Sequence, residues 1–250
     1  MMNIYVGTSG FAHKEWKGKF YPKDISPKDM IQFYAERLKS VEINNTFYHM
    51  PKESVLMAWA ERVPQDFVFA LKAPQVITHI KRLRNVFEET EYLFRSLSVL
   101  DRKLGPILFQ FPKSFRVDGP ALKDFFALIP DTRPCAFEFR SPTWNDDEIL
   151  TLLRERGFSL CISDVDENPA NDIISTAPWG YLRLRRSNYT DDDLLQWTKT
   201  ILSQQWEKAF VFFKHEGDIN GAETAMRFDE LIDSKFASGK TRKGRTIGAR

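Results

Sequence analysis

The feature that most constrains the fold is a series of short apolar runs, most of which end in polar or charged residues. We expect eight such runs to be β-strands, at residues 3–8, 40–44, 67–73, 106–111, 135–140, 158–164, 180–185 and 208–214. Nearly continuous apolar character over about four to eight residues is typical of strands that are buried on both faces of a parallel sheet. A charge at the end of such a strand therefore needs a specific explanation.

Segments with helical periodicity separate most of these runs. In one of them, Met30, Phe33 and Tyr34 recur at the spacing of one helix face, and a second such segment covers 93–100. Regular alternation of strand and helix predicts a parallel sheet, and eight repeats predict closure into a single (β/α)8 barrel of the TIM type. The expected α/β barrel domain covers residues 1–234.

Three segments in the second half of the chain carry more specific signals. The sixth connection, 165–179, contains Pro169 and Pro178 and little apolar sequence, so we expect the sixth helix to be missing or reduced. A helix near 191–203 begins after Thr190 with three aspartates, which suit an N-cap and the positive end of the helix dipole. Another helix is expected near 219–233.

The last sixteen residues, 235–250, form a basic tail. They contain six Lys or Arg residues and no acid, whereas the whole chain has a net charge of +2, so the preceding body carries −4. Their composition lacks apolar periodicity and predicts a flexible segment. A basic tail can bind nucleic acid or an anionic surface.

Other sequence features bear on location and on covalent chemistry. The N-terminal residues lack the pattern of a signal peptide, and no apolar run is long enough to span a membrane, so we expect a cytoplasmic protein without a membrane partner. Cys135 and Cys161 fall in expected strands without metal or redox spacing and are predicted to be buried thiols. Nothing in the sequence specifies an oligomeric state.

The period-two alternation of strand side chains decides which residues point into the barrel. Phe137 and Phe139 share one face of the fifth run, while Glu138 and Arg140 share the other. The outer face of a barrel lies under helices and must be apolar, so the polar set points inward. The sixth run fits less well, because Asp164 shares its face with apolar residues. The candidate site residues are Glu42, Asn44, Lys72, Gln110, Glu138, Arg140, Asp164, Arg183, Arg185 and Lys214.

Inward charges are costly to bury, so we expect these side chains at the wet, C-terminal mouth of the barrel. Their positive charges outnumber their negative charges, which predicts a small anionic ligand bearing phosphate or carboxylate. Glu42 and Glu138 are the candidates for catalytic proton transfer, and the other eight are candidates for substrate binding. The expected activity is that of a hydrolase, lyase or isomerase without a redox cofactor.

Several alternatives remain open at the level of sequence. The charges could form an ion-pair network that only stabilises the barrel, or the two carboxylates could hydrolyse glycosides. The sequence contains no nucleotide-binding glycine motif, and we expect no cofactor and no metal, although His79 or His215 with Glu138 and Asp164 would form a mixed metal site. The protein could also be a ligand sensor. A further alternative is a protein that binds nucleic acid or processes its phosphodiester bonds, through the tail and the basic, aromatic segment Lys14–Lys19.

An ordered series of motifs resembles the YecE-like family, also called domain of unknown function family 72. The segments that carry the resemblance are Gly7–Gly10 with Trp16, Val41–Tyr48, Phe69–Lys72 with Thr78 and His79, Leu104–Pro112, Glu138–Arg140 with Trp144, and Tyr181–Leu184. The resemblance covers nearly the whole chain before the tail and implies a (β/α)8-like barrel. Two positions depart from the family pattern, at Arg185–Arg186 and Lys214–His215, and both add positive charge at the mouth.

Overall fold

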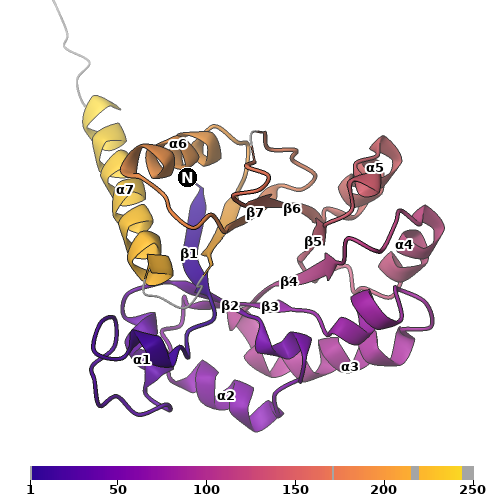
Figure 1. Ribbon diagram of the computed structural model, residues 1–250, viewed down its shortest axis with the longest axis horizontal. Helices are drawn as coiled ribbons and strands as arrows, with labels where there is room; N and C mark the ends of the chain where they lie inside the picture. Colours follow the sequence, from indigo (N-terminus) through magenta and orange to yellow (C-terminus); the bar gives the residue numbers. More distant parts are fainter. Residues whose placement is uncertain (1, 171, 215–219, 244–250) are drawn as a thin grey trace, which may run out of the picture.

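The computed structural model describes residues 2–170, 172–214 and 220–243, and its eight strands form one closed parallel barrel (Figure 1). Each strand pairs with the next in the sequence, and the last closes on the first. This topology confirms the predicted (β/α)8 barrel. The strands are β1 (Asn3–Ser9), β2 (Ser40–Ile43), β3 (Val68–Lys72), β4 (Leu104–Phe111), β5 (Cys135–Phe139), β6 (Ser159–Asp164), β7 (Trp179–Leu184) and β8 (Lys208–Phe213).

Helices lie around the outside of this barrel (Figure 1). The α-helices are α1 (Met30–Ala35), α2 (Glu53–Glu61), α3 (Phe87–Leu97), α4 (Gly119–Phe126), α5 (Asp147–Arg156), α6 (Asp191–Leu202) and α7 (Asn220–Lys243). Shorter helical turns are η1 (Lys14–Trp16), η2 (Asn45–Phe47), η3 (Val76–Ile80), η4 (Ser98–Lys103) and η5 (Pro142–Trp144).

The connection between β6 and β7 differs from the others. Its described residues, 165–170 and 172–178, contain no helix, as the prolines predicted. One side chain ties this connection to the start of β6: Thr176 Oγ1 accepts a hydrogen bond from Leu160 N and donates one to Phe158 O. The chain therefore returns to the barrel through a hydrogen-bonded loop.

The two helices after β7 and β8 begin close to where the sequence predicted. At the start of α6, Thr190 Oγ1 accepts from Asp193 N and the Asp193 carboxylate accepts from Thr190 N, which is a reciprocal capping box. Helix α7 spans Asn220–Lys243 and so continues into the segment predicted to be a flexible tail. Residues 244–250 of that segment lie outside the described residues.

Aromatic side chains fill the layer between strands and helices. Phe109 and Phe137 point outward and pack edge-on against Phe125 and Phe126 of α4, with ring centroids 5.0 Å apart in both pairs. Burying a side chain of this size contributes about 2–3 kcal/mol, and such ring pairs add about 1 kcal/mol. These contacts confirm that the outward phenylalanines of β4 and β5 face the helices.

The barrel interior has an apolar lower layer below the polar mouth. The lower layer consists of Ala70, Leu108, Ala136, Cys161, Tyr181, Phe210 and Phe212. Two residues further along their strands, Ala70 leads to Lys72, Leu108 to Gln110 and Ala136 to Glu138. Both cysteines are free and buried, as predicted. The interior is thus sealed from below, and the polar side chains lie above this seal.

The aromatic segment after β1 belongs to the outer core. Trp16 is fully buried, and Phe20 packs against Phe33 of α1 with ring centroids 5.9 Å apart. Phe11 contacts Trp59 of α2 in the same way at 5.6 Å. The sequence suggested that this segment could contact nucleic acid. Its rings instead anchor the first loop to α1 and α2. Burying the rings against these helices is favourable and removes them from contact with a ligand.

None of the helices formed by the described residues combines the length and the apolar character needed to cross a bilayer.

Candidate functional site

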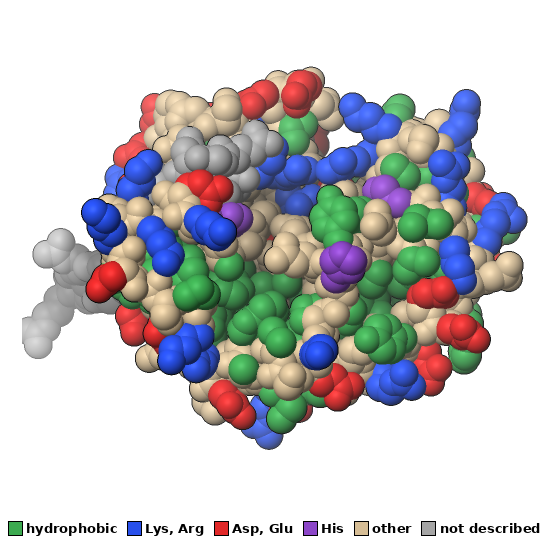
Figure 2. All heavy atoms as spheres, turned by 60° about the horizontal axis from the view of Figure 1, so that its bottom comes forward, with side chains coloured by type: hydrophobic (Ala, Val, Ile, Leu, Met, Phe, Trp, Pro, Cys, Tyr) green, Lys and Arg blue, Asp and Glu red, His purple; other side chains and the backbone are tan. Residues whose placement is uncertain are grey.

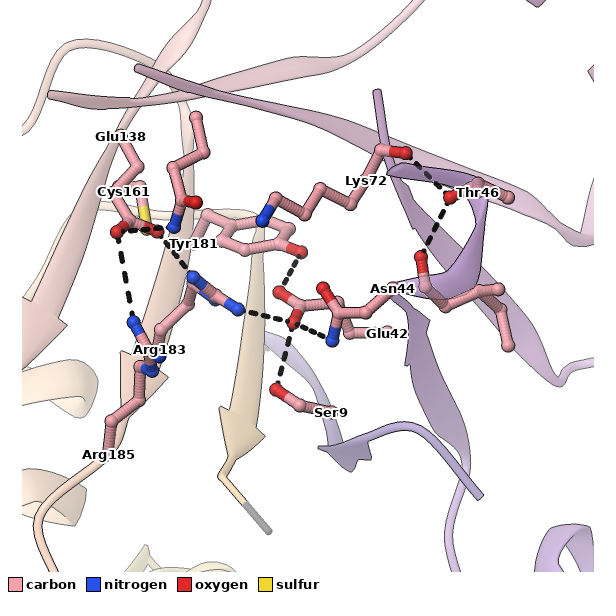
Figure 3. Close-up of polar contacts among 12 residues, drawn as sticks. Ser9, Glu42, Asn44, Thr46, Lys72, Glu138, Cys161, Tyr181, Arg183 and Arg185 are labelled. Atoms are coloured by element: carbon pink, nitrogen blue, oxygen red, sulfur yellow. Dashed lines mark hydrogen bonds and ion pairs between the residues drawn. The ribbon is translucent and has the colours of Figure 1, made fainter. Parts of the chain in front are cut away.

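The centre of the mouth is a buried guanidinium that bridges two buried carboxylates (Figure 3). Arg183 on β7 donates from one terminal nitrogen to Glu138 Oε2 at 2.6 Å and from the other to Glu42 Oε1 at 2.9 Å. All three side chains are at most 4% exposed. The network therefore joins β2, β5 and β7 at their carboxyl ends, where barrel active sites occur.

Neutral donors complete the hydrogen bonding of Glu42. Its Oε1 also accepts from Ser9 Oγ at 2.8 Å and from Asn44 Nδ2 at 3.0 Å, and its Oε2 accepts from the Tyr181 hydroxyl at 2.8 Å. Tyr181 lies two residues before Arg183 on β7 and so shares its inward face. A carboxylate with this many donors is fixed in position and stabilised as the anion.

Donors of graded exposure surround Glu138. Its Oε1 accepts from Gln110 Nε2 at 2.8 Å and from Arg140 Nε at 3.2 Å, and Arg185 approaches the same oxygen at 4.0 Å. The exposed fraction of the arginine side chains rises from 4% at Arg183 to 16% at Arg185 and 37% at Arg140. These arginines therefore form a path of positive charge from solvent to the buried network.

Lys72 reaches the mouth from β3 over an aromatic ring. Its Nζ lies 3.8 Å from the centre of the Phe47 ring, and Phe47 belongs to the short turn η2 that follows β2. The Thr46 hydroxyl donates to the backbone oxygens of Ile43 and Lys72. This hydroxyl fastens the turn to the ends of β2 and β3, so the ring is held beneath the lysine.

The electrostatics of the centre keep both carboxylates ionised. Burial alone would raise the pKa of Glu42, but the charge of Arg183 and the hydrogen bonds from Arg183, Tyr181 and Asn44 hold it below its usual value. Burial also opposes ionisation of Glu138, and the charges of Arg183, Arg140 and Arg185 overcome it and lower its pKa to about 2.

Two further groups near the mouth lose basicity. Burial, followed by the charge of Arg183, lowers the pKa of Lys72 to about 8. Burial, followed by the charge of Lys72, lowers the pKa of His79 to about 4. The His79 ring packs edge-on against Phe47 with centroids 4.9 Å apart, and its Nδ1 lies 2.8 Å from Thr78 Oγ1. His79 is therefore neutral at physiological pH.

Positive charge and unused donors remain after these contacts. The two carboxylates face four cationic side chains, Lys72, Arg140, Arg183 and Arg185, which leaves an excess of two positive charges. The Nε–H groups of Arg183 and Arg185 are buried and meet no acceptor among the described residues. Figure 2 shows a group of Lys and Arg side chains recessed in a hollow near the top of the view, and elsewhere on that face acidic and basic side chains are mixed.

The structure brings eight of the ten predicted residues to the network, but it does not bring Asp164. Asp164 pairs with Leu184 in the sheet and points outward, where its Oδ2 accepts from Arg186 Nε at 2.9 Å, from the Tyr189 hydroxyl at 2.8 Å and from Trp197 Nε1 at 3.3 Å. The residue was predicted to bind substrate. Its strand phase, shared with apolar neighbours, places it between the barrel and α6 instead.

Lys214 lies at the side of the mouth rather than in the network. It lines a cleft of about 140 Å³ together with Arg185, Arg186 and the first residues of α7. Burial, followed by the charge of Arg185, lowers its pKa. The cleft extends the positive region toward the ends of β7 and β8.

The described part of the chain contains no group of three His, Cys, Asp or Glu side chains that could hold a metal ion. His79 lies next to Lys72 and Phe47 rather than beside Asp164. His215, the other candidate ligand, falls outside the described residues.

Sequence reasoning missed three residues that complete the site. Tyr181 and Ser9 bind Glu42, and Thr46 positions the Lys72 backbone. Tyr181 could have been found, because period-two alternation puts it on the face of Arg183. Ser9 and Thr46 carry no such signal, because both lie where strand geometry ends.

Comparison with known proteins assigns the chain to a family. A family model described as "Protein of unknown function DUF72" matches residues 5–245. The chain belongs to the DUF72 family. This assignment confirms the resemblance to the YecE-like family that the sequence motifs indicated.

Both curated relatives and solved structures support the DUF72 assignment. The chain is 24% identical to the UPF0759 protein YunF of Bacillus subtilis over 94% of this chain and 96% of YunF. It is 31% identical to the UPF0759 protein YecE of Escherichia coli K12, over 64% of this chain and 59% of YecE.

Two crystal structures of DUF72 family proteins share the fold. The protein from Thermotoga maritima has a TM-score of 0.82 and 26% identity, with 92% of this chain and 99% of that chain covered. The protein from Enterococcus faecalis has a TM-score of 0.78 and 20% identity, with 92% and 95% covered. The barrel is thus common to these DUF72 proteins.

Proposed function

We propose that the barrel mouth binds a small molecule bearing phosphate or carboxylate and acts on it by acid/base chemistry, as a hydrolase, lyase or isomerase without a redox cofactor. The observation that carries the proposal is the pair of buried Nε–H donors on Arg183 and Arg185 that meet no acceptor among the described residues. A buried donor without an acceptor is costly, at about 1–3 kcal/mol. A bound anion would satisfy both donors and the excess positive charge.

Each residue of the mouth has a role in this proposal. Arg185 and Arg140 hold the anion, because guanidinium groups bind phosphate and carboxylate oxygens in pairs. Arg183 forms the floor of the anion site. Glu42 and Glu138 position Arg183 from both sides, and Gln110 orients Glu138.

Proton transfer is reassigned from the two carboxylates to Lys72. A carboxyl group with a pKa of about 2, as at Glu138, cannot donate a proton at neutral pH and is a weak base. The pKa of Lys72, about 8, lies near the physiological range, where a group can both accept and donate a proton. The sequence placed Lys72 among the anion-binding residues only.

The alternatives explain fewer observations. A network that only stabilises the barrel would need Arg183 and its two carboxylates, but it would not need Lys72, Arg140 and Arg185 in addition. The nucleic-acid alternative loses its aromatic contact, because Trp16 is fully buried. A ligand sensor would use the same pocket and is distinguished by the absence of turnover.

The proposal is tested by calorimetric titration of the full chain with inorganic phosphate and, separately, with citrate. We expect one site per chain, and we expect Arg140→Gln combined with Arg185→Gln to weaken binding at least about tenfold, the equivalent of about 1.4 kcal/mol. Arg37→Gln is the matched control. Arg37 pairs with Glu36 after α1, far from the mouth, and its side chain is about as exposed as that of Arg140.

Two results would contradict the proposal. One is that neither anion binds the unmodified chain, and the other is that the double variant binds as tightly as Arg37→Gln. If anions bind at the mouth but no phosphate ester or carboxylic acid in a broad substrate screen is converted, the acid/base part fails and the sensor alternative stands.

A further inference from the structure

Within the described part of the chain, Lys72 is a cation without a counter-ion of its own. The two carboxylates of the mouth, Glu42 and Glu138, both pair with Arg183. Among the described residues, the Nζ group of Lys72 has no ion-pair partner, and it lies over the face of the Phe47 ring. The lysine side chain is partly buried and extends from β3 toward Tyr181 and the network around Arg183 (Figure 3).

The surroundings of this amine increase the share of its neutral form near physiological pH. The charged groups that face it are Arg183, Arg140, Glu138 and Glu42, and its other neighbour, His79, is neutral. Burial and the two guanidinium charges outweigh the carboxylates, so its pKa is lowered to about 8. At pH 7.5 such an amine has on the order of 100-fold more neutral form than an ordinary lysine.

We propose that Lys72 is a nucleophile that forms an imine with an aldehyde or ketone group of an anionic ligand. This inference rests on the proposed function, because Arg140 and Arg185 hold the anionic end of the ligand in the same mouth. It adds the substrate class, a carbonyl compound bearing phosphate or carboxylate. Lysines desolvated beside another cation are known nucleophiles of this type.

The chemistry balances without an oxidant, a reductant or a co-reactant. The ammonium first loses one proton to water, and the neutral amine then forms a C–N bond to the carbonyl carbon. The carbonyl oxygen leaves as water after it takes up protons from the amine and from solvent. The net change converts one ammonium and one carbonyl compound into one protonated imine and one water. Hydrolysis reverses these steps and frees the amine.

A lysine that served only as a permanent positive charge would be expected to have hydrogen-bond acceptors that stabilise its ammonium. Lys103 shows how a buried lysine that stays charged is placed: its ammonium donates to the backbone oxygens of Ala60 and Val63. These acceptors stabilise its charge. Lys72 contacts the face of the Phe47 ring, which supports its charge, but burial and two guanidinium neighbours oppose that charge. A partly desolvated amine beside other cations is suited to a nucleophile.

The test is imine trapping on the full chain at pH 7.5. Glyoxylate and glycolaldehyde phosphate are the anionic aldehyde probes, acetaldehyde is the uncharged control, and sodium borohydride reduces any imine to a stable secondary amine. Intact mass spectrometry counts adducts and peptide mapping places them. We expect one adduct per chain on Lys72, at least about tenfold more with the anionic probes than with acetaldehyde, and none on Lys103.

The variant Lys72→Arg keeps the positive charge and removes the amine. It should retain binding of inorganic phosphate within about threefold and lose the adduct. Three results overturn the inference: no adduct on Lys72 with either anionic probe, adducts spread evenly over exposed lysines, or an undiminished adduct in Lys72→Arg. If no imine is trapped but the unmodified chain still binds phosphate, the proposed anion site stands. If no imine is trapped and the unmodified chain does not bind phosphate, both the imine proposal and the anion site are wrong.

Discussion

Two regions of this protein contain an arginine bound to a buried carboxylate at the end of a strand, and only one of them faces the mouth. Arg183 lies inside the barrel between Glu42 and Glu138, with three more cations nearby. Arg186 lies outside the barrel between Asp164 and Asp193. The inner region has an excess of positive charge, whereas the outer region has two carboxylates for one arginine.

The difference between the two regions indicates that the outer one has a structural role and the inner one binds a ligand. At the outer site, the hydroxyl of Tyr189, the indole of Trp197 and the backbone of Ala170 also donate to Asp164. That site fastens the connection after β6, whose described residues form no helix, to α6. At the inner site, cations and donors remain beyond what the carboxylates need, and this surplus indicates a ligand. Four predictions test the contrast.

The largest effect is expected from removing the two arginines one at a time. Arg183→Met leaves two buried carboxylates without their cation and should cost about 4 kcal/mol or more in the free energy of unfolding, measured with urea at pH 7. Arg186→Met leaves Asp164 with three neutral donors and should cost about 2 kcal/mol. Equal losses would remove the distinction between the regions.

The Arg183 variant can be rescued if its cost comes from unpaired charge. Adding Glu42→Gln and Glu138→Gln to Arg183→Met removes both uncompensated carboxylates. The triple variant should therefore be more stable than Arg183→Met alone. A triple variant that is less stable would assign the cost to lost packing.

The second effect is a dependence of stability on acid pH. The folded-state pKa of Glu138, about 2, is below its ordinary value of 4.5, so the unfolded chain binds more protons between these pH values and stability falls as pH falls through this window. The contribution at pH 7 is roughly 3 kcal/mol. Glu138→Gln should flatten the stability curve between pH 4.5 and 2, and an unchanged slope would show that Glu138 is not held ionised.

The third effect has opposite signs at two lysines. The pKa of Lys72 is lowered from 10.5 to about 8, so the unfolded chain binds more protons between these values and wild-type stability rises with pH there. Lys72→Met should stabilise the protein at pH 7 by on the order of 1 kcal/mol and remove this rise. Lys103→Met should instead cost about 1–3 kcal/mol, because two buried carbonyls lose their donor. If both variants, or neither of them, are more stable than the wild type, the difference assigned to the two lysines is wrong.

The smallest effect is expected from Tyr189→Phe in the outer region. It removes one hydrogen bond to Asp164 and should cost about 1 kcal/mol, or about 2–4 °C in Tm by calorimetry. Phosphate binding should not change, because Asp164 points away from the mouth. A loss of phosphate affinity in this variant would place the outer region in the binding site.

The strand phase explains both the success and the error of the sequence interpretation. Glu138 and Gln110 alternate with phenylalanines, so the apolar face identified the outward direction and the polar face identified the mouth. Asp164 alternates with Cys161 and Ser163 but shares its face with Leu160 and Ile162, and that phase correctly marks it as outward. Its charge alone suggested the mouth, and the phase was the better guide.

The sequence by itself determined the (β/α)8 barrel, the lack of a helix in the described residues after β6, the capped start of α6 and the inward face of most strands, because these follow from local periodicity and turn chemistry. Only the tertiary structure decided that Glu42 and Glu138 both bind Arg183, which leaves Lys72 without a counter-ion among the residues that the structure describes. These residues are far apart in the chain, and pairing among several charges depends on distances that closure of the barrel sets. Sequence therefore located the charges, and the fold decided which of them remain available to a ligand.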